Sequence, residues 1–327
     1  MSGSNGDDRF LGKAPSTTSF FGIATFARVP GVEISGDWEA DAAIIGVPYD
    51  GSAGYRPGAR FGPQAIRSAS GRFNLFRTGE GYWDIASGER NLKGFTVVDC
   101  GDVEVLEIDY EGTFQRLQSA VAAVMDRGAI PVILGGDHSI TAPAFSAVGG
   151  AALDRGSGRG LSLVHFDAHL DYRHSKNGKL HGHGSPIRRC AEEPFAEQIV
   201  SLGMRGLRAS ESDYHEAVER GNVIVPCERI HEEGTAAVLE GLPALGPTYL
   251  TIDIDVLDPA VAPGTGTPEV DGLSHRQLAR LIKGIATRSE IIAIDLVEVN
   301  PFFDPAGITA LTAAQTIIEV LSGINAP

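Results

Sequence analysis

VHFDAHLDY, residues 164–172, joins the end of an apolar run to a series of acidic and imidazole side chains. The run Leu161–Phe166 is almost entirely apolar, as expected of a strand that is buried on both faces of a sheet. Asp167, His169 and Asp171 follow at a spacing of two, so in an extended segment their side chains point the same way. The stretch therefore predicts a buried strand that brings three ligand-type side chains to one end of a sheet.

Two other apolar runs end in the same kinds of side chain. VILGGDHS, residues 132–139, passes through two glycines, which let the backbone turn tightly and leave His138 facing the site. In TIDIDVLD, residues 251–258, Asp253 and Asp255 share one face of the segment while the apolar residues take the other. One such motif is a weak signal, but three of them, each after an apolar strand, predict one shared site.

Short apolar runs alternate with amphipathic helical stretches along the chain. The runs are Ala42–Val47, Phe95–Val98, Ile130–Leu134, Leu161–Phe166, Gln198–Leu202, Asn222–Val225, Thr248–Ile254 and Ile291–Val297. Between them, residues 114–124 repeat apolar side chains at helical spacing, Ser274 and Gln277 form a capping box, and Gly307–Gly323 is a mostly apolar helix. This alternation predicts an α/β fold, a parallel sheet with helices on both faces. Sites in such sheets lie beyond the carboxyl ends of the strands.

The chain contains no interdomain linker and no internal repeat. We therefore expect a single catalytic domain over residues 21–327. The first 20 residues, which lack an apolar core of signal-peptide length, are expected to form a disordered or extended tail.

The three motifs supply an oxygen-rich set of ligands, namely His138, Asp167, His169, Asp171, Asp253 and Asp255. So many carboxylates do not suit one structural zinc site, which favours Cys and His. Carboxylates that lie close together repel one another unless cations compensate them, and two divalent ions that share bridging carboxylates would do so. Oxygen ligands with some imidazole suit Mn²⁺, although Ni²⁺, Co²⁺ or Zn²⁺ could also bind. The sequence therefore predicts a binuclear centre, with Mn²⁺ as the first choice.

At these residues the chain resembles the arginase–agmatinase family of ureohydrolases, in its agmatinase-like branch. GGDHS, DAHLD and DIDVLDP are similar to the family's metal motifs, and GVPYDGSAGYRPGARFGPQAIR at 46–67 is similar to its agmatinase-type signature. APGTGTPE at 262–269 and DLVEVNP at 295–301 are similar to later motifs. The resemblance implies a three-layer α/β/α fold around an eight-stranded parallel sheet.

The resemblance also implies roles for individual residues. It makes the six motif residues the ligands of two metal ions per subunit, with Asp167 and Asp253 as the bridges. Glu298, at the end of the last strand, is expected to bind a planar guanidinium through bidentate hydrogen bonds. The family's proton-shuttling histidine lies in a His-Gly pair, and HGHGSP at 181–186 offers two of them. The family pattern favours His183, and His181 remains the alternative.

The expected reaction is hydrolysis of a guanidino compound to urea and an amine. Two divalent ions would lower the pKa of a bridging water. Asp171 would orient the resulting hydroxide, and His183 would protonate the departing amine. Agmatine, which would give the polyamine putrescine, is the first choice of substrate. The basic loop at 172–183 favours the alternative, a guanidino acid such as 4-guanidinobutyrate, 3-guanidinopropionate or a proclavaminate-type compound. The competing classes are a metal-dependent deacetylase of the same fold and a non-catalytic homologue.

Composition restricts the partners and the compartment. The 27 basic and 42 acidic residues give a formal charge of −15, which argues against nucleic acid and could steer a cationic substrate. No apolar run approaches the roughly 20 residues needed to span a membrane. The cysteines Cys100, Cys190 and Cys227 are odd in number and far apart, which fits a reduced cytoplasm. The resemblance further implies a homo-oligomer, a trimer or a hexamer.

Overall fold

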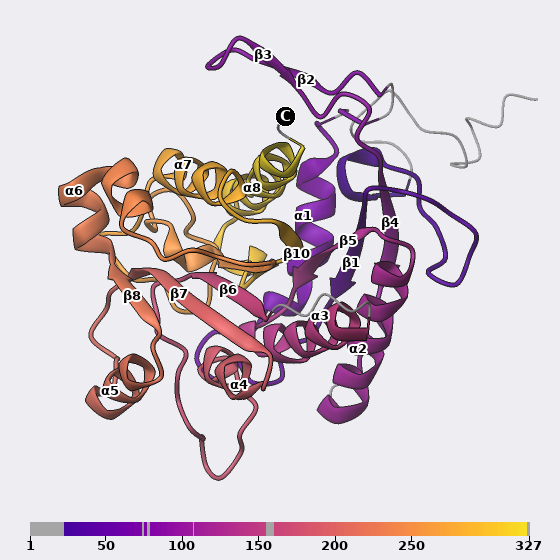
Figure 1. Ribbon diagram of the computed structural model, residues 1–327. Helices are drawn as coiled ribbons and strands as arrows, with labels where there is room; N and C mark the ends of the chain where they lie inside the picture. Colours follow the sequence, from indigo (N-terminus) through magenta and orange to yellow (C-terminus); the bar gives the residue numbers. More distant parts are fainter. Residues whose placement is uncertain (1–22, 74, 77–78, 107, 155–159, 326–327) are drawn as a thin grey trace, which may run out of the picture.

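The computed structural model describes residues 23–73, 75–76, 79–106, 108–154 and 160–325. The tail expected over residues 1–20 lies outside these ranges. Within them, one parallel sheet has the strand order β4-β1-β5-β10-β9-β6-β7-β8 (Figure 1). Its strands are β1 (Ala42–Val47), β4 (Val97–Asp102), β5 (Ile130–Gly135), β6 (Leu161–Phe166), β7 (Ala196–Met204), β8 (Val223–Pro226), β9 (Thr248–Asp253) and β10 (Ile291–Val297).

Each of the eight apolar runs is a strand of this sheet, so the prediction of an eight-stranded parallel sheet is confirmed. No pattern in the sequence indicated the small antiparallel hairpin formed by β2 (Tyr82–Asp84) and β3 (Glu89–Asn91). Strands of only three residues are too short to show a period of two. The hairpin extends away from the body of the molecule (Figure 1).

Helices cover both faces of the sheet. One face carries α1 (Gly62–Ser70), α6 (Cys227–Glu240), α7 (His275–Ala286) and α8 (Ile308–Ile324), and the other carries α2 (Tyr110–Asp126), α3 (Thr141–Asp154), α4 (Pro186–Glu192) and α5 (Glu211–Glu219) (Figure 1). The core is correspondingly divided into two apolar clusters. In β1, Ile44 belongs to one cluster and its neighbours Ala43 and Ile45 to the other, as alternation along a strand requires. The fold is therefore the three-layer α/β/α arrangement.

Helix α7 shows how the sequence specifies one covering helix. The capping box is present: Ser274 N donates to Oε1 of Gln277 at 2.9 Å, and Gln277 N donates to Oγ of Ser274 at 3.3 Å. Leu278, Leu281, Ile282 and Ile285 form its buried stripe. Each buried aliphatic side chain of this kind stabilises the fold by about 1.5–3 kcal/mol relative to exposure. None of the helices in the described ranges is long and apolar enough to cross a membrane.

The strands β5, β10, β9 and β6 are consecutive neighbours in the middle of the sheet. The predicted ligands and Glu298 follow the carboxyl ends of these four strands. Parallel strands end at the same edge, so the fold gathers these side chains at one place.

Candidate active site

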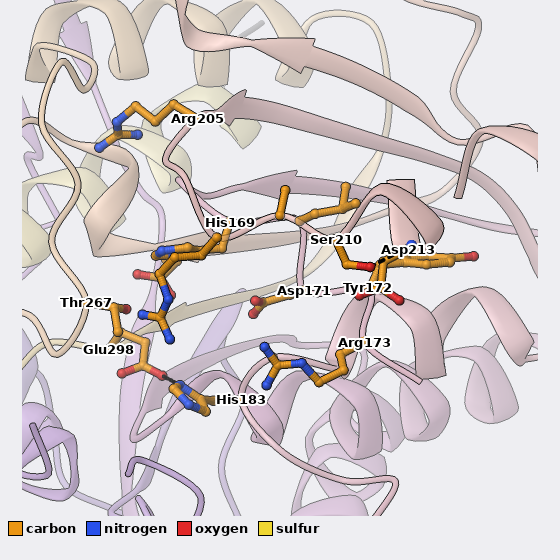
Figure 2. A pocket seen from close by; sticks show the side chains of 15 residues that line it. His169, Asp171, Tyr172, Arg173, His183, Arg205, Ser210, Asp213, Thr267 and Glu298 are labelled. Atoms are coloured by element: carbon orange, nitrogen blue, oxygen red, sulfur yellow. Dashed lines mark hydrogen bonds and ion pairs between the residues drawn. The ribbon is translucent and has the colours of Figure 1, made fainter. Parts of the chain in front are cut away.

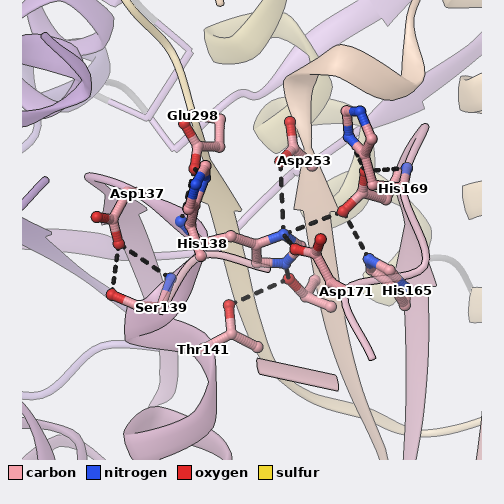
Figure 3. Close-up of polar contacts among 12 residues, drawn as sticks. Asp137, His138, Ser139, Thr141, His165, His169, Asp171, Asp253 and Glu298 are labelled. Atoms are coloured by element: carbon pink, nitrogen blue, oxygen red, sulfur yellow. Dashed lines mark hydrogen bonds and ion pairs between the residues drawn. The ribbon is translucent and has the colours of Figure 1, made fainter. Parts of the chain in front are cut away.

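His138, just beyond β5, lies among carboxylates that come from the other strand ends (Figure 3). Its side chain is buried. The Nδ1 atom lies 3.1 Å from Oδ2 of Asp167, 3.1 Å from Oδ2 of Asp171 and 3.4 Å from Oδ2 of Asp253. The three motifs thus converge around one imidazole nitrogen.

His169 forms the second part of the cluster. Its Nδ1 atom lies 3.2 Å from Oδ2 of Asp255 and 3.3 Å from Oδ1 of Asp167. Asp167 therefore directs one carboxylate oxygen toward His169 and the other toward His138. That position between two groups suits a carboxylate that bridges two cations.

The chain brings these ligands together by turns rather than by extended strands. Strand β6 ends at Phe166, and Asp171 has a φ of +48°. Asp253 ends β9, and its Oδ1 accepts a hydrogen bond from Asp255 N at 2.9 Å, which caps a single 3₁₀ turn. We expected the ligands after each strand to share one face of an extended segment. That expectation is wrong, because β6 ends at Phe166 and β9 ends at Asp253.

The glycines ahead of His138 also act differently from the expectation of a tight turn. Neither Gly135 nor Gly136 has a positive φ. A Cβ atom on Gly136 would lie 1.8 Å from the carbonyl oxygen of Tyr49, and Asp137 N donates to that oxygen at 2.7 Å. Close packing of the backbone against the loop after β1 is what requires glycine here.

Glu298 lies directly beyond β10, beside the cluster (Figure 3). Its Oε1 accepts a hydrogen bond from the backbone N of His138 at 3.0 Å, which ties the end of β10 to that of β5. Its φ is +63°, and that of Asp171 is also positive. A residue with a side chain costs roughly 1–2 kcal/mol in this left-handed region. Strain of this kind gathers at functional sites, so it adds to the case for both residues.

His183 lies against Glu298 in the same pocket (Figure 2). Its Nδ1 is 3.4 Å from Oε1 of Glu298, and its backbone N donates to Oγ of Ser52 at 2.9 Å. Ser52 Oγ in turn donates to Oδ2 of Asp137 at 2.7 Å, so the loop is fixed to the motif that carries His138. Burial lowers the pKa of His183, but the Glu298 carboxylate outweighs it and raises the pKa to about 9.

His181, the alternative, lies elsewhere. Its side chain is exposed, and its ring centroid is 6.1 Å from that of Tyr110 and 6.1 Å from that of Phe114 on α2. The part of the ring that packs on α2 is shielded from water, and this partial burial, with nearby Arg189, lowers its pKa. The segment is therefore not extended with both imidazoles on one side, and of the two only His183 lines the pocket.

The pKa values in the cluster indicate an excess of buried negative charge. Burial opposes protonation of His138 and His169, but the carboxylates around each ring outweigh it and hold both pKa values well above the usual range. Burial and neighbouring carboxylates raise the pKa of Asp253 and Asp255. Burial acts in the same direction on Asp167, but the nearby histidines outweigh it and hold that pKa well below the usual range. Bound cations would compensate this buried negative charge.

The cluster fits divalent metal ions. Nδ1 of His138 is buried and has no hydrogen-bond partner among the described residues, although three carboxylates surround it. Asp167, His169 and Asp255 offer ligand atoms that all lie within 4.8 Å of one another, and so do His138, His165 and Asp167. An imidazole nitrogen that faces carboxylate oxygens without a hydrogen bond has a lone pair available to a cation.

His165 is a member of this cluster that we did not predict. Its Nε2 lies 2.8 Å from Oδ2 of Asp167 and its Nδ1 lies 3.1 Å from Oγ of Ser201. Both ring nitrogens thus have partners, one directly beyond β6 and one in β7, so His165 holds Asp167 in place. The signal was present in the sequence, because His165 precedes Asp167 by two.

Two further residues come from the segment 262–269. Thr267 Oγ1 donates to Oδ2 of Asp255 at 3.2 Å, and Oε1 of Glu269 lies 3.4 Å from Nε2 of His169. The sequence showed this segment only as a family motif, because no pattern in it indicates that it folds back over the ends of β6 and β9.

The pocket is also lined by three arginines, Arg173, Arg205 and Arg208. Figure 2 shows the first two. Arg205 is committed to the backbone, since its Nη2 donates to the carbonyl oxygens of Asp255 at 2.7 Å and Glu269 at 2.9 Å. Arg173 and Arg208 make no side-chain hydrogen bond or ion pair with any described residue. Two guanidinium groups at the pocket are therefore available to a ligand.

Comparison with known proteins agrees with the metal motifs. The model of the Arginase family matches residues 40–323. The mitochondrial agmatinase of Gallus gallus is 36% identical over 305 residues, which cover 92% of this chain and 85% of that protein. The guanidinopropionase of Pseudomonas aeruginosa is 37% identical over 308 residues, which cover 92% of each chain.

A solved structure shows the same fold. The proclavaminate amidino hydrolase of Streptomyces clavuligerus superposes with a TM-score of 0.83 at 32% identity. The match covers 94% of this chain and 99% of that one.

Proposed function

The chain belongs to the arginase family of ureohydrolases, and from this membership we propose that it hydrolyses a small guanidino compound to urea and an amine. The observation that carries the proposal is the pair Glu298 and His183 beside a buried cluster of histidines and aspartates. This pair offers an anion for a guanidinium and a proton for its departing nitrogen. Binding modules and structural proteins have no need of such a pair at a charged cluster.

We propose that two divalent cations, Mn²⁺ by first choice, are held by His138, Asp167, His169, Asp171, Asp253 and Asp255. When bound, they supply a water that ionises near neutral pH and compensate the buried carboxylates. Asp171 stands where its carboxylate can accept a hydrogen bond from that water, because it lies between the cluster and the pocket.

Glu298 binds and orients the substrate in this proposal. Its carboxylate faces the pocket, and a planar guanidinium can donate two parallel hydrogen bonds to it. The oxygen of water bonds to the guanidino carbon, and the bond from that carbon to the substituted nitrogen breaks. His183, protonated at neutral pH through its contact with Glu298, gives its proton to the departing nitrogen. Urea and an amine remain.

For the rest of the substrate, we propose a carboxylate tail, as in 4-guanidinobutyrate and 3-guanidinopropionate. Arg173 and Arg208 line the same pocket as Glu298, and neither is paired with a described residue. Arg173 reaches from its loop toward His183 and Asp171 (Figure 2). Arginine matches a carboxylate with parallel N–H groups, so these side chains suit an anionic tail.

Agmatine, the first choice from the sequence alone, is the second candidate. Asp213 lines the same pocket and could bind the ammonium of agmatine. The formal charge of −15 would also steer a dication toward the protein. Outside the cluster of proposed metal ligands, the pocket offers two unpaired arginines against one aspartate, which makes the carboxylate tail the better match.

The experiment is a urea assay on metal-free protein reloaded with Mn²⁺ or Ni²⁺. The substrates are 4-guanidinobutyrate, 3-guanidinopropionate, agmatine, arginine and free guanidine, with an acetylated lysine peptide for the deacetylase alternative. A kcat/KM at least tenfold higher for a guanidino acid than for agmatine is expected. Release of urea from agmatine alone would contradict the proposed guanidino-acid substrate. Release of acetate without urea would contradict the proposed hydrolysis to urea and indicate a deacetylase.

We further propose one catalytic domain over residues 21–327 and a homo-oligomer, a trimer or a hexamer. An exposed aromatic pair supports the oligomer: Phe302 and Phe61 are 63% and 43% exposed, and their ring centroids lie 5.0 Å apart. Surfaces of this kind commonly mark contacts between chains. Light scattering after gel filtration gives the number of chains, and a monomer would refute the oligomer.

A cytoplasmic location is also part of the proposal. Cys100, Cys190 and Cys227 are all free, and the last two are buried. Free buried thiols suit a reducing compartment. Cell fractionation checks this, and enrichment in mitochondria would contradict it.

A further inference from the structure

Asp295 is a buried carboxylate that the proposed reaction does not use. It lies in β10, two strands of the sheet away from β6, and its side chain is fully enclosed. No Lys, Arg or His in the described part of the chain lies within ion-pair distance of it. Burying a carboxylate without a cation is costly unless hydrogen bonds compensate it.

Three hydroxyl groups supply that compensation. Tyr249 OH donates to Oδ2 of Asp295 at 2.7 Å, Thr141 Oγ1 donates to Oδ2 at 2.8 Å, and Thr251 Oγ1 donates to Oδ1 at 2.5 Å. Thr251 is directly opposite Asp295 in the register of β9 and β10, so both side chains lie on the same face of the sheet.

Thr251 also contacts His138. The distance from its Oγ1 to Nε2 of His138 is 3.0 Å, on the opposite side of the ring from the carboxylate cluster. Burial raises the pKa of Asp295, but the hydrogen bonds from Thr251, Tyr249 and Thr141 favour its ionised form. A threonine hydroxyl has one hydrogen, and the short contact to that carboxylate takes it. Thr251 must therefore accept a hydrogen bond from His138, which places the ring proton on Nε2.

That proton assignment decides what His138 can bind. With the proton on Nε2, the lone pair of Nδ1 faces Asp167, Asp171 and Asp253. The three carboxylates themselves favour a proton on Nδ1, since an N–H there would be attracted to them. A proton at Nδ1 would exclude a cation, so something on the other side of the ring has to hold the tautomer.

We propose that Asp295 and Thr251 are positioning residues that fix the tautomer and the ring orientation of His138 for a divalent cation. The proposal rests on the proposed metal centre, and it assigns to Asp295 a role at a distance from the substrate. Partners of this kind behind a histidine ligand commonly change metal affinity by 10–100-fold.

The chain offers a matched control. Thr251→Val and Tyr249→Phe each remove one hydroxyl that donates to Asp295, but only the first removes the partner of His138. If Asp295 matters only for folding, the two variants should behave alike. Thr251→Ser keeps the hydroxyl and serves as the conservative rescue.

The test titrates Mn²⁺ into the metal-free full chain and measures free Mn²⁺ by electron paramagnetic resonance, without any activity assay. Thr251→Val is expected to bind one of the two ions about 10–100-fold more weakly than wild type. Tyr249→Phe and Thr251→Ser are expected to stay within about threefold of wild type, while T251V and Y249F lose comparable melting temperature in the metal-free state.

Each other outcome is decisive. Wild-type Mn²⁺ affinity in Thr251→Val overturns the positioning role of Asp295 and Thr251 but leaves the metal centre standing. Equal weakening of Mn²⁺ binding in Tyr249→Phe has the same consequence. If the wild-type protein binds no Mn²⁺, both the proposed metal centre and the positioning role of Asp295 and Thr251 are overturned. If Thr251→Val does not fold, Asp295→Asn replaces it in the same comparison, because an amide at 295 adds an N–H donor and removes an acceptor.

Discussion

Nδ1 of His183 lies 3.4 Å from Oε1 of Glu298, and the same oxygen accepts a hydrogen bond from the backbone of His138. One carboxylate thus links the His-Gly-His-Gly loop at 181–184 to the end of a central strand. In the proposed reaction this contact serves two steps, because the anion that holds the guanidinium also keeps its proton donor charged. Changes at either residue should therefore have separable effects on chemistry and on metal content.

His183→Ala should lower kcat by about 10²–10⁴-fold, the range typical of a general acid. The departing amine needs a proton, and no other imidazole in the pocket is free of the cluster. His181→Ala is the matched control, because it stands two residues away and packs against Tyr110 and Phe114 instead. Turnover is measured at equal metal loading. A larger loss in His181→Ala would reverse the assignment.

The activity of the wild-type enzyme should fall on the alkaline side as His183 loses its proton. Glu298 raises the pKa of His183 to about 9, so the acid form is present at neutral pH and is lost as pH rises through that value. Cations in the neighbouring cluster would oppose the rise, which places the midpoint between the ordinary ~6.5 and about 9. A pH profile of kcat/KM measures it. Loss of activity only below pH 6 would contradict this role.

Glu298→Gln should weaken catalysis and leave both metal ions bound. The amide keeps the shape of the side chain but removes the charge that pairs with a guanidinium, so kcat/KM should fall by the equivalent of roughly 1.5–3 kcal/mol. Urea release and metal content are measured on the same preparation. Loss of metal in this variant would mean that Glu298 has been misread as a residue that binds substrate.

Asp253→Asn should lose metal. Asp253 lies 3.4 Å from His138 and is the proposed bridge from β9, so an amide there removes one of the shared negative charges. Elemental analysis after dialysis should find fewer than two ions per chain, and activity should fall with them. Two ions and full activity in this variant would remove Asp253 from the centre.

The extent of prediction differs between the sheet and the site. All eight parallel strands were predictable, because strands such as β1 are buried on both faces and read as continuous apolar runs. The hairpin β2–β3 was not, since its stability depends on neighbours rather than on its own pattern. Local hydrophobicity and connection rules therefore predict a parallel sheet with helices on both faces, whereas the order of its strands follows from tertiary contacts that no local pattern contains.

The site was predictable in composition but not in geometry. Aspartates and histidines after strand ends indicated the metal ligands, yet the left-handed backbone at Asp171 and Glu298 follows from tertiary contacts that no local pattern contains. The choice between His181 and His183 similarly depended on where α2 lies, because the His181 ring packs against Phe114 of that helix. Asp295 lay unnoticed inside an apolar strand, where one acidic residue gives no periodic signal.

The two pocket arginines should determine which tail is accepted. Arg208→Gln and Arg173→Gln are each expected to lower kcat/KM for 4-guanidinobutyrate by about 10–100-fold, because a charged hydrogen bond to the carboxylate is worth about 1.5–3 kcal/mol. The same variants should leave agmatine hydrolysis unchanged or faster, since removing a positive charge lowers repulsion of its ammonium. Arg90→Gln, on the hairpin strand β3, is the control for loss of an exposed arginine. Equal losses on both substrates would show that the arginines support the fold of the pocket and do not read the tail.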